Sequence, residues 1–273
     1  MQMSTLFPEK DTGMSDEEIK DPLLEKPEGK GAFETTREAR EYLQWALKCA
    51  NAERSKISTT KGEVEQQLLD MQGMSGYKYR HLLNNLCSRE GITYSEVGTW
   101  MGSTFLCATY GNEKIKASTC DNWSEFGGPK QIFLQNYQGV GSFPGNAKAF
   151  SNSEHIIFDQ DFRTVDFSVV APIDIYFFDG PHSRKDQRDG LVMAWDALAP
   201  VSIVLVDDWN WGRPRKGTWD ALNEMNADIH YQAEIFTPPA GWITAEKDPK
   251  HGKNTQFSQS EWHNGVAMFV IKK

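Results

Sequence analysis

The sequence has no hydrophobic run long enough to cross a membrane, and its longest apolar segments have the length of a strand. It also has no excess of positive charge, since 29 Lys and Arg against 38 Asp and Glu give a net charge of −9. Nucleic acids and anionic lipid surfaces attract basic proteins, so we expect no nucleic acid and no membrane as partners. The first 30 residues lack the apolar core of a secretion signal, which favours a cytoplasmic protein.

Cysteine is scarce and scattered in this sequence. The four cysteines are Cys49, Cys87, Cys107 and Cys120. They form no CxxC pair, and no histidine stands at zinc-finger spacing from them. The sequence therefore predicts neither a disulfide framework nor a structural zinc site, and we expect each cysteine to be a small buried hydrophobic residue.

The chain divides into three regions by composition and periodicity. Residues 1–32 combine Pro, Gly and mixed charges without periodicity, which predicts a mobile tail. Residues 33–90 carry apolar residues at helical spacing, and we expect their helices to serve packing, oligomerisation or as a lid. The expected helices are Phe33–Ala52, Gly62–Met71 and Tyr77–Arg89. Residues 91–273 form the third region.

From Gly91 onward, short β-rich segments alternate with stretches of the length of a crossover. These segments are Thr93–Val97, Lys114–Thr119, His155–Phe158, Ile173–Phe178 and Ser202–Val206. The alternation predicts an α/β fold with a mostly parallel sheet and helices on both faces. Ile229–Phe236 and Gly265–Ile271 add an antiparallel pair at the edge, which completes seven strands. The long connection Thr237–Asn264 between them is expected to be a lid or wall on the substrate side.

Ligands of open α/β sheets bind at the carboxyl ends of the strands, so the residues that follow each strand are the candidate site. Gly98 and Gly102 follow the first strand, although a plain strand-to-helix turn would also use them. Asp121 ends the second strand about 20 positions further on, where a carboxylate can accept both ribose hydroxyls of a nucleoside. The glycines of a nicotinamide-binding loop and the lysine of a phosphate-binding loop are both missing.

Acidic residues end the fourth and fifth predicted strands. Asp179 follows one of them, and Asp207 and Asp208 follow the other, so the three carboxylates should converge. Clustered carboxylates repel one another unless a cation or a proton intervenes, and their hard oxygens suit Mg²⁺, with Mn²⁺ or Ca²⁺ as alternatives. The other interpretation is that the paired acids only begin a turn. His182 lies three residues beyond Asp179, where it could be a general base or a structural histidine.

Three motifs in order carry a resemblance to a known family. They are Glu96-Val97-Gly98-x-x-x-Gly102-x-Thr104 with Asp121, then Asp179-Gly180-Pro181-His182-Ser183, then Asp207-Asp208. Together they resemble class I S-adenosylmethionine-dependent methyltransferases, in particular the small-molecule O-methyltransferase branch with Asp-Gly-x-His and paired-Asp metal motifs. The resemblance covers about residues 91–273 and implies a Rossmann-like doubly wound sheet, here preceded by the N-terminal helices. One departure is Pro200-Val201-Ser202, where the family commonly has a Gly-Gly turn.

The resemblance implies a role for each motif residue. The S-adenosylmethionine-binding residues would be Glu96, Gly98, Gly102, Ser103, Asp121, Asp159 and Gln160. Gly98 and Gly102 would admit the methionine and ribose portions, and Glu96 would orient the methionine amino group through the loop. Asp121 would hold the ribose. The adenine would lie near Asp159 or Gln160, with Asp161 competing for the same role.

The sequence therefore predicts an S-adenosylmethionine-dependent, divalent-metal-assisted O-methyltransferase of a small molecule such as a sugar, a glycoside or a catechol. Asp179 and His182 would be catalytic, and Asp179, Asp207 and Asp208 would hold Mg²⁺ or another divalent cation. Trp209 and Trp211 follow the paired acids and would either line the substrate pocket or pack in the core or at the surface. The alternatives are a hydroxylase-like metal enzyme of the same fold without methyl transfer and a non-catalytic nucleotide-binding protein. Association into a homo-oligomer through the N-terminal helices is a further option.

Overall fold

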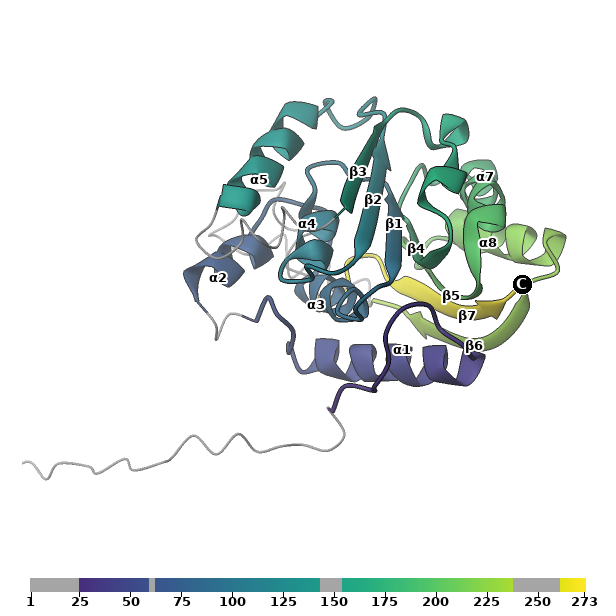
Figure 1. Ribbon diagram of the computed structural model, residues 1–273. Coiled ribbons are helices and arrows are strands. Elements are labelled where there is room, and N and C mark those ends of the chain that lie inside the picture. Colours follow the sequence, from purple (N-terminus) through teal and green to yellow (C-terminus); the bar gives the residue numbers. More distant parts are fainter. Residues whose placement is uncertain (1–24, 59–61, 143–153, 238–260) are drawn as a thin grey trace, which may run out of the picture.

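A twisted seven-stranded sheet runs through the protein in the computed structural model, which describes residues 25–58, 62–142, 154–237 and 261–273 (Figure 1). Its strand order is β3-β2-β1-β4-β5-β7-β6. The strands are β1 Thr93–Val97, β2 Lys116–Asp121, β3 Glu154–Asp159, β4 Ile173–Phe178, β5 Leu198–Val206, β6 Asp228–Ile235 and β7 Val266–Lys272. The predicted α/β Rossmann-like fold is thereby confirmed.

The last two strands form the predicted antiparallel pair. β7 also pairs antiparallel with β5, so it lies one position inside the sheet and β6 forms the edge. Because β7 runs against its neighbours, its first residues lie beside the last residues of β5, with Val206 opposite Ala267. The chain just before β7 therefore reaches the carboxyl edge of the parallel strands.

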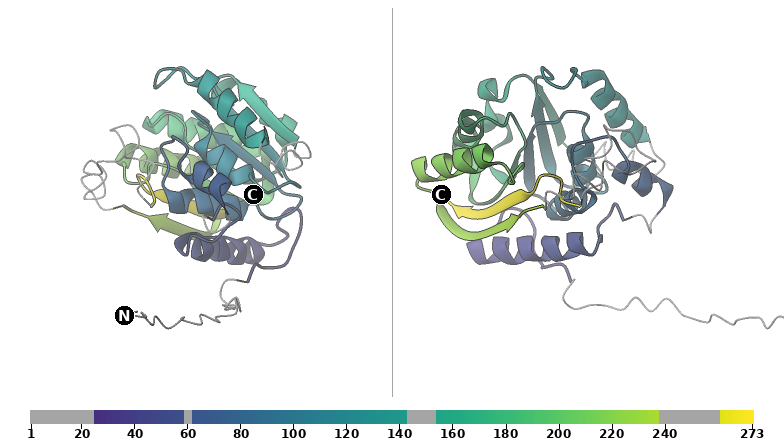
Figure 2. Two further views of the ribbon diagram at one scale, coloured as in Figure 1. Left: turned by 90° about the vertical axis from the view of Figure 1, so that its left-hand side faces the viewer. Right: turned by 180° about the vertical axis from the view of Figure 1, so that it is seen from behind.

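Helices cover both faces of the sheet (Figure 2). The helices are α1 Thr36–Asn51, α2 Glu63–Leu69, α3 Tyr77–Leu86, α4 Ser103–Thr109, α5 Lys130–Ser142, α7 Arg184–Ala194 and α8 Gly212–Glu224. Short 3₁₀ turns lie at η3 Phe162–Thr164, η4 Phe167–Val170 and η5 Trp195–Ala197. Within the described residues, no helix is long and apolar enough to span a membrane.

The N-terminal helices pack on one face of the sheet. Thr35 caps α1 by accepting a hydrogen bond from the backbone N–H of Glu38 at 3.1 Å. Tyr42 and Leu43 on the apolar side of α1 are fully buried in one cluster with residues of β5 and β7. Figures 1 and 2 show α1 lying along β6 and β7. The helices of residues 33–90 therefore share the core of the sheet that follows them.

Part of the predicted mobile tail is held against the body of the protein. The backbone N–H of Gly31 donates to the carbonyl of Glu90 at 2.7 Å, and the Arg89 guanidinium donates to the carbonyl of Gly31 at 2.7 Å. The buried Arg89 also donates to the carbonyls of Lys30 and Ala32, so the end of this region is fixed to the body of the protein. Residues 1–24 lie outside the described part of the chain.

α7 and α8 cover the opposite face, where two glycines allow close packing. A Cβ at Gly190 would lie 1.9 Å from the ring of Phe178, and one at Gly217 would lie 2.3 Å from the carbonyl of Arg184. On the outside, Arg184 of α7 pairs with Asp220 of α8. The four cysteines are all buried and free, as predicted.

Candidate active site

A pocket opens at the carboxyl ends of β1, β2, β3 and β4, where the sequence places the candidate residues. Of those residues it brings together Gly98, Asp121, Gln160, Asp179 and His182. Glu96, Gly102, Ser103 and Asp159 are not among its lining residues. The pocket is therefore built from strand ends, as expected of an open α/β sheet.

Gly98 is required by the close approach of two strand ends. Its φ is +100°, and a Cβ there would lie 1.8 Å from the carbonyl oxygen of Asp179. Its N–H donates to the carbonyl of Cys120 at 2.9 Å, which closes the turn after β1. A side chain at this position would push the ends of β1 and β4 apart, so glycine keeps the floor of the pocket intact.

Gly102 and Ser103 serve the helix that follows. Gly102 has φ +89° at the N-cap of α4, and a Cβ there would lie 2.7 Å from the ring of Phe133. Ser103 is buried, and its hydroxyl lies 3.3 Å from that of Ser75. The contact with Phe133 accounts for this glycine without a ligand. Binding of the cofactor by Gly102 and Ser103 stays a prediction.

Glu96 supports the loop from inside the protein. Its fully buried carboxylate accepts hydrogen bonds from the hydroxyls of Tyr94 at 2.6 Å and Thr104 at 2.9 Å. Burial raises the pKa of Glu96 to about 8, although both hydrogen bonds act in the opposite direction. These contacts tie β1 to α4 beneath the pocket, and the predicted role toward the methionine amino group stays a prediction.

Asp121 is held in the pocket wall by backbone donors. Its two carboxylate oxygens accept the N–H groups of Trp100 at 2.7 Å and Trp123 at 2.6 Å. Each oxygen keeps a second lone pair, so each can still accept a hydrogen bond from a ribose hydroxyl. The geometry is compatible with the predicted ribose contact.

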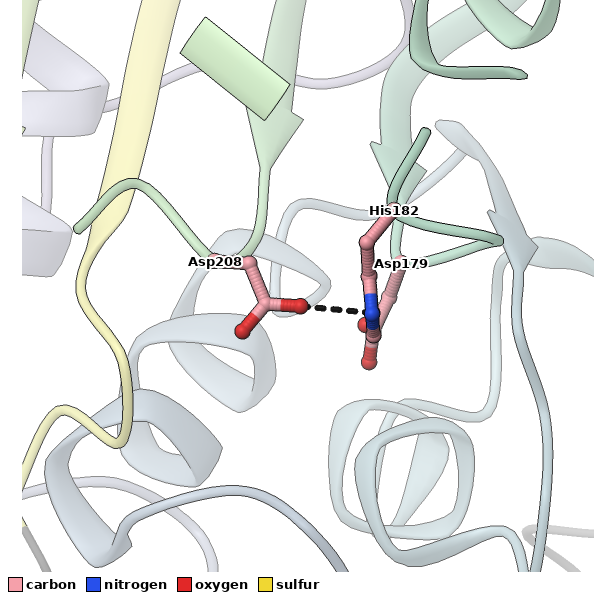
Figure 3. Close-up of side chains that lie close together, drawn as sticks. All are labelled: Asp179, His182 and Asp208. Atoms are coloured by element: carbon pink, nitrogen blue, oxygen red, sulfur yellow. Dashed lines mark ion pairs between the residues drawn. The ribbon is translucent and has the colours of Figure 1, made fainter. Parts of the chain in front are cut away.

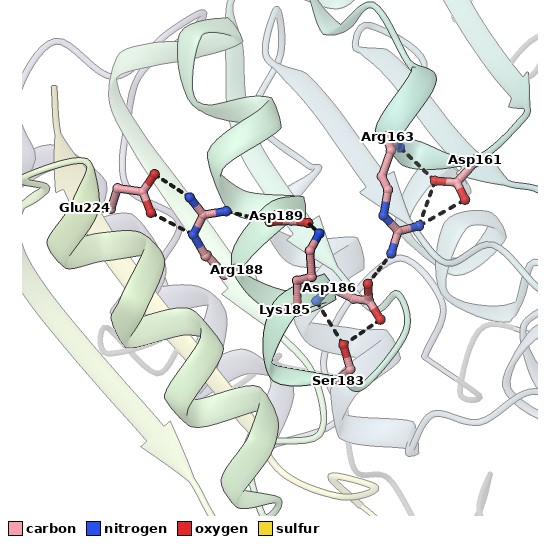
Figure 4. A network of polar contacts seen from close by, with 8 residues as sticks. All are labelled: Asp161, Arg163, Ser183, Lys185, Asp186, Arg188, Asp189 and Glu224. Atoms are coloured by element: carbon pink, nitrogen blue, oxygen red, sulfur yellow. Dashed lines mark hydrogen bonds and ion pairs between the residues drawn. The ribbon is translucent and has the colours of Figure 1, made fainter.

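The structure separates the two residues predicted near the adenine. Asp159 is exposed and forms an ion pair with Lys130, away from the pocket lining. Gln160 and Asp161 both line the pocket. Figure 4 shows how Arg163 bonds the Asp161 carboxylate at 3.0 Å and also contacts Asp186 of α7. Arg163 therefore fixes this side of the pocket relative to the helix that follows His182.

The predicted acidic cluster forms at the ends of β4 and β5. Asp179, His182 and Asp208 each place one ligand atom within 4.8 Å of the others, and Figure 3 shows the three side chains together. Asp207 and Asp208 form a second such group with His263. Asp179 and His182 line the pocket, so the cluster borders it directly.

Charge and burial set the ionisation of this cluster. Burial and the neighbouring charge of Asp208 raise the pKa of Asp207 well above its ordinary value. Burial and the charges of Asp207 and Asp208 likewise raise the pKa of Asp179 well above its ordinary value. Burial also opposes ionisation of Asp208, but its hydrogen bond to His182 outweighs this and lowers the pKa. Three carboxylates at this spot therefore need a cation or protons to offset their charge.

His182 pairs with Asp208 through Nε2 at 2.6 Å from Oδ2. Burial lowers the pKa of His182, but the hydrogen bond and the charge of Asp208 outweigh burial and raise it. The imidazole ring lies nearly perpendicular to the indole of Trp211, with ring centroids 5.0 Å apart and planes at 89°. Trp209, by contrast, is fully buried against Phe269, so it belongs to the core.

Sequence reasoning missed two residues just before β7. The side-chain amide of Asn264 donates to Oδ1 of Asp208 at 2.7 Å, and His263 belongs to the second group of ligand atoms. The antiparallel direction assigned to the last strand was the available signal, because it places the start of that strand beside the paired acids. Residues 238–260, most of the predicted lid, lie outside the described residues.

Residues 95–209, which include the three carboxylates of the acidic cluster and every lining residue of the pocket except Met74, match the family model of a methyltransferase domain. The chain contains an S-adenosylmethionine-dependent methyltransferase domain. No curated protein matches the sequence of this methyltransferase. The family model describes methyltransferases in general, so the O-methyltransferase branch stays a prediction.

Solved structures of other methyltransferases are similar to this one. A "putative caffeoyl-CoA O-methyltransferase" from Staphylococcus aureus is 11% identical, with a TM-score of 0.50 over 85% of this chain and 99% of that chain. TrmK of M. capricolum, solved in complex with S-adenosyl-homocysteine, is 14% identical, with a TM-score of 0.41 over 71% of this chain and 67% of TrmK. At these identities the similarity concerns the fold.

Proposed function

We propose that this methyltransferase transfers the methyl group to a hydroxyl of a small molecule with the help of a divalent cation. The observation that supports the proposal is that Asp208 shares one group of ligand atoms with Asp179 and another with Asp207, beside a pocket that Asp121 and Gly98 also border. A pocket for a nucleoside and a cluster of hard oxygen ligands thus share one edge of the sheet. S-adenosylmethionine supplies a methyl group activated by the positive charge of its sulfur.

The acidic cluster fits a divalent cation. Oδ1 of Asp207 is buried and has no hydrogen-bond partner among the described residues, and an oxygen in that state is costly without a counter-charge. Asp179, Asp207 and Asp208 would hold the ion, because carboxylate oxygens are the ligands that Mg²⁺ prefers. Such an ion lowers the pKa of a bound hydroxyl and fixes its orientation.

His182 is the proposed general base. Asp208 accepts the hydrogen bond of Nε2, which favours the neutral tautomer with the lone pair on Nδ1. That nitrogen takes the proton of the acceptor hydroxyl, and the charge of Asp208 stabilises the imidazolium that results. His182 also belongs to one group of ligand atoms, so a second role as metal ligand competes with this one.

Transfer of a labelled methyl group to a panel of sugars, glycosides and catechols tests the proposal. We expect a methyl ether as product, loss of activity with excess chelator and recovery with Mg²⁺. Asp208→Asn should abolish this recovery, whereas Asp196→Asn, an exposed carboxylate removed from the cluster, should behave as the wild type. Full activity with chelator would contradict the metal, and substrate conversion without methyl transfer would favour the hydroxylase-like alternative.

A further inference from the structure

A second hollow lies just outside the pocket, on the other side of His182. It is lined by His182, Ser183, Trp211, Gly212 and Arg213, and His182 borders both hollows. On the basis of the proposed function, we propose that this outer groove binds the acceptor substrate, and that this substrate is a hydroxylated ring with an anionic substituent. The proposed base then stands between cofactor and acceptor.

Trp211 offers the ring a stacking surface. It is 40% exposed, although an indole is among the most costly side chains to leave in water. The perpendicular contact with the imidazole of His182 holds the indole of Trp211 in place. A planar ring, or the apolar face of a sugar, that covers the indole would therefore lie next to the proposed base.

Arg213 offers the substrate a positive charge. Its side chain is exposed, and no ion pair of Arg213 is found among the described residues. Nearby arginines are engaged, since Arg184 pairs with Asp220 and Arg215 donates to the carbonyl of Trp209 at 2.5 Å. A guanidinium binds a carboxylate or a phosphate through two parallel hydrogen bonds, which Lys cannot imitate.

The positive charge of Arg213 stands out against the negative net charge of the protein. A protein with a net charge of −9 repels anions at long range, so an anionic acceptor needs a specific positive contact at its site. The first turn of α8, where Arg213 lies, has no acidic residue to neutralise that contact. An anionic group on the substrate fits this position better than a neutral one.

Calorimetry with matched pairs of probes tests the inference, with S-adenosylhomocysteine and Mg²⁺ present. The aromatic pair is 3,4-dihydroxybenzoate and catechol, and the sugar pair is glucose 6-phosphate and glucose. We expect the anionic member of at least one pair to bind about tenfold more tightly, the scale of one charged hydrogen bond. The pair that shows the preference tells whether the ring is aromatic or a sugar.

Variants of the groove assign the preference to residues. Arg213→Gln should bring the anionic and neutral members to equal affinity, and Trp211→Ala should weaken both members of the pair alike. Lys216→Gln removes an exposed charge on the same helix outside the groove and should change neither. Equal affinities in the wild type, no binding of any anionic probe, or a preference that survives Arg213→Gln would overturn the inference. Failure of the proposed function would show instead as absent methyl transfer with this preference intact.

Discussion

At the scale of single residues, Asp208 links the end of β5 to His182 after β4 and to Asn264 before β7. One carboxylate oxygen holds His182 at 2.6 Å, and the other accepts the amide of Asn264 at 2.7 Å. The backbone of Asp208 has a φ of +55°, an uncommon value for a residue other than glycine. Strained residues gather at functional sites, and the contacts of Asp208 supply the fixed partners that keep it there.

If His182 is the base, removing its imidazole should impair turnover and little else. We expect His182→Ala to lower kcat by about 10²–10⁴-fold, the usual range for a general base. S-adenosylhomocysteine affinity and Mg²⁺ affinity should stay within a few-fold of the wild type, because the three carboxylates remain. Steady-state kinetics and calorimetry measure both. A large loss of Mg²⁺ affinity with this variant would assign His182 to the metal ligands instead.

Glu96 should make the stability of the fold depend on pH. Its folded pKa of about 8 lies above its ordinary value of 4.5, so the folded state retains a proton that the unfolded state loses. Its contribution is therefore complete below the unfolded pKa and declines as pH rises to the folded pKa. Glu96→Gln lacks this ionisation, so we expect the free energy of unfolding of the variant to rise steadily relative to that of the wild type as the pH increases from about 5 to 8. Urea unfolding at several pH values tests this, and a difference independent of pH would contradict the raised pKa.

The residues that sequence reasoning predicted best are those whose position follows from strand ends. Asp208 lies in one group of ligand atoms with Asp179 and in another with Asp207, because the parallel neighbours β4 and β5 end at one edge. Asp159 also ends a strand, but β3 lies at the other edge of the sheet from β6, and the exposed Asp159 carboxylate pairs with Lys130. Side-chain direction at such a position depends on tertiary partners that the local sequence does not reveal.

At the scale of elements, the turn between β1 and α4 determines the shape of the pocket. Gly98→Ala would place a methyl group 1.8 Å from the carbonyl oxygen of Asp179, in a backbone conformation that disfavours Ala. We expect a loss of about 2–5 kcal/mol in the free energy of unfolding, together with weaker S-adenosylhomocysteine binding.

Gly139→Ala is the matched control for this substitution. Gly139 lies in α5, and apart from its chain neighbours and the backbone of its own helix, no atom of the described residues lies within 4 Å of an added Cβ. We therefore expect a gain of about 0.5–1 kcal/mol. Denaturant unfolding compares the two variants. Equal stabilities would show that the approach of the β1 and β4 ends does not require glycine.

Element boundaries were predicted well where the sequence carries a local signal. β1 and β4 have the predicted bounds, because each is a short β-rich segment closed by a turn. β5 begins at Leu198, four residues before the predicted strand, since Pro200 stays in the strand with its side chain exposed. The position of β7 inside the sheet depends on pairing between distant segments, which no local pattern contains.

At the scale of the whole molecule, the N-terminal helices and the sheet share one core. Leu43 of α1 and Ile203 of β5 are fully buried in the same cluster. We therefore expect the helices of residues 33–90 to unfold together with the sheet in a single transition. Far-ultraviolet circular dichroism and tryptophan fluorescence should give coincident urea curves. Two separate transitions would contradict the shared core.

We expect two ligands, S-adenosylmethionine and a divalent cation, to bind at one edge of the sheet, each held by its own residues. Calorimetric titration of Mg²⁺ and of S-adenosylhomocysteine into the wild type and Asp207→Asn tests this most directly. We predict that both bind to the wild type, and that the variant loses Mg²⁺ binding while its S-adenosylhomocysteine affinity stays within a few-fold. A wild type that binds S-adenosylhomocysteine but takes up no divalent cation would contradict the metal-assisted mechanism.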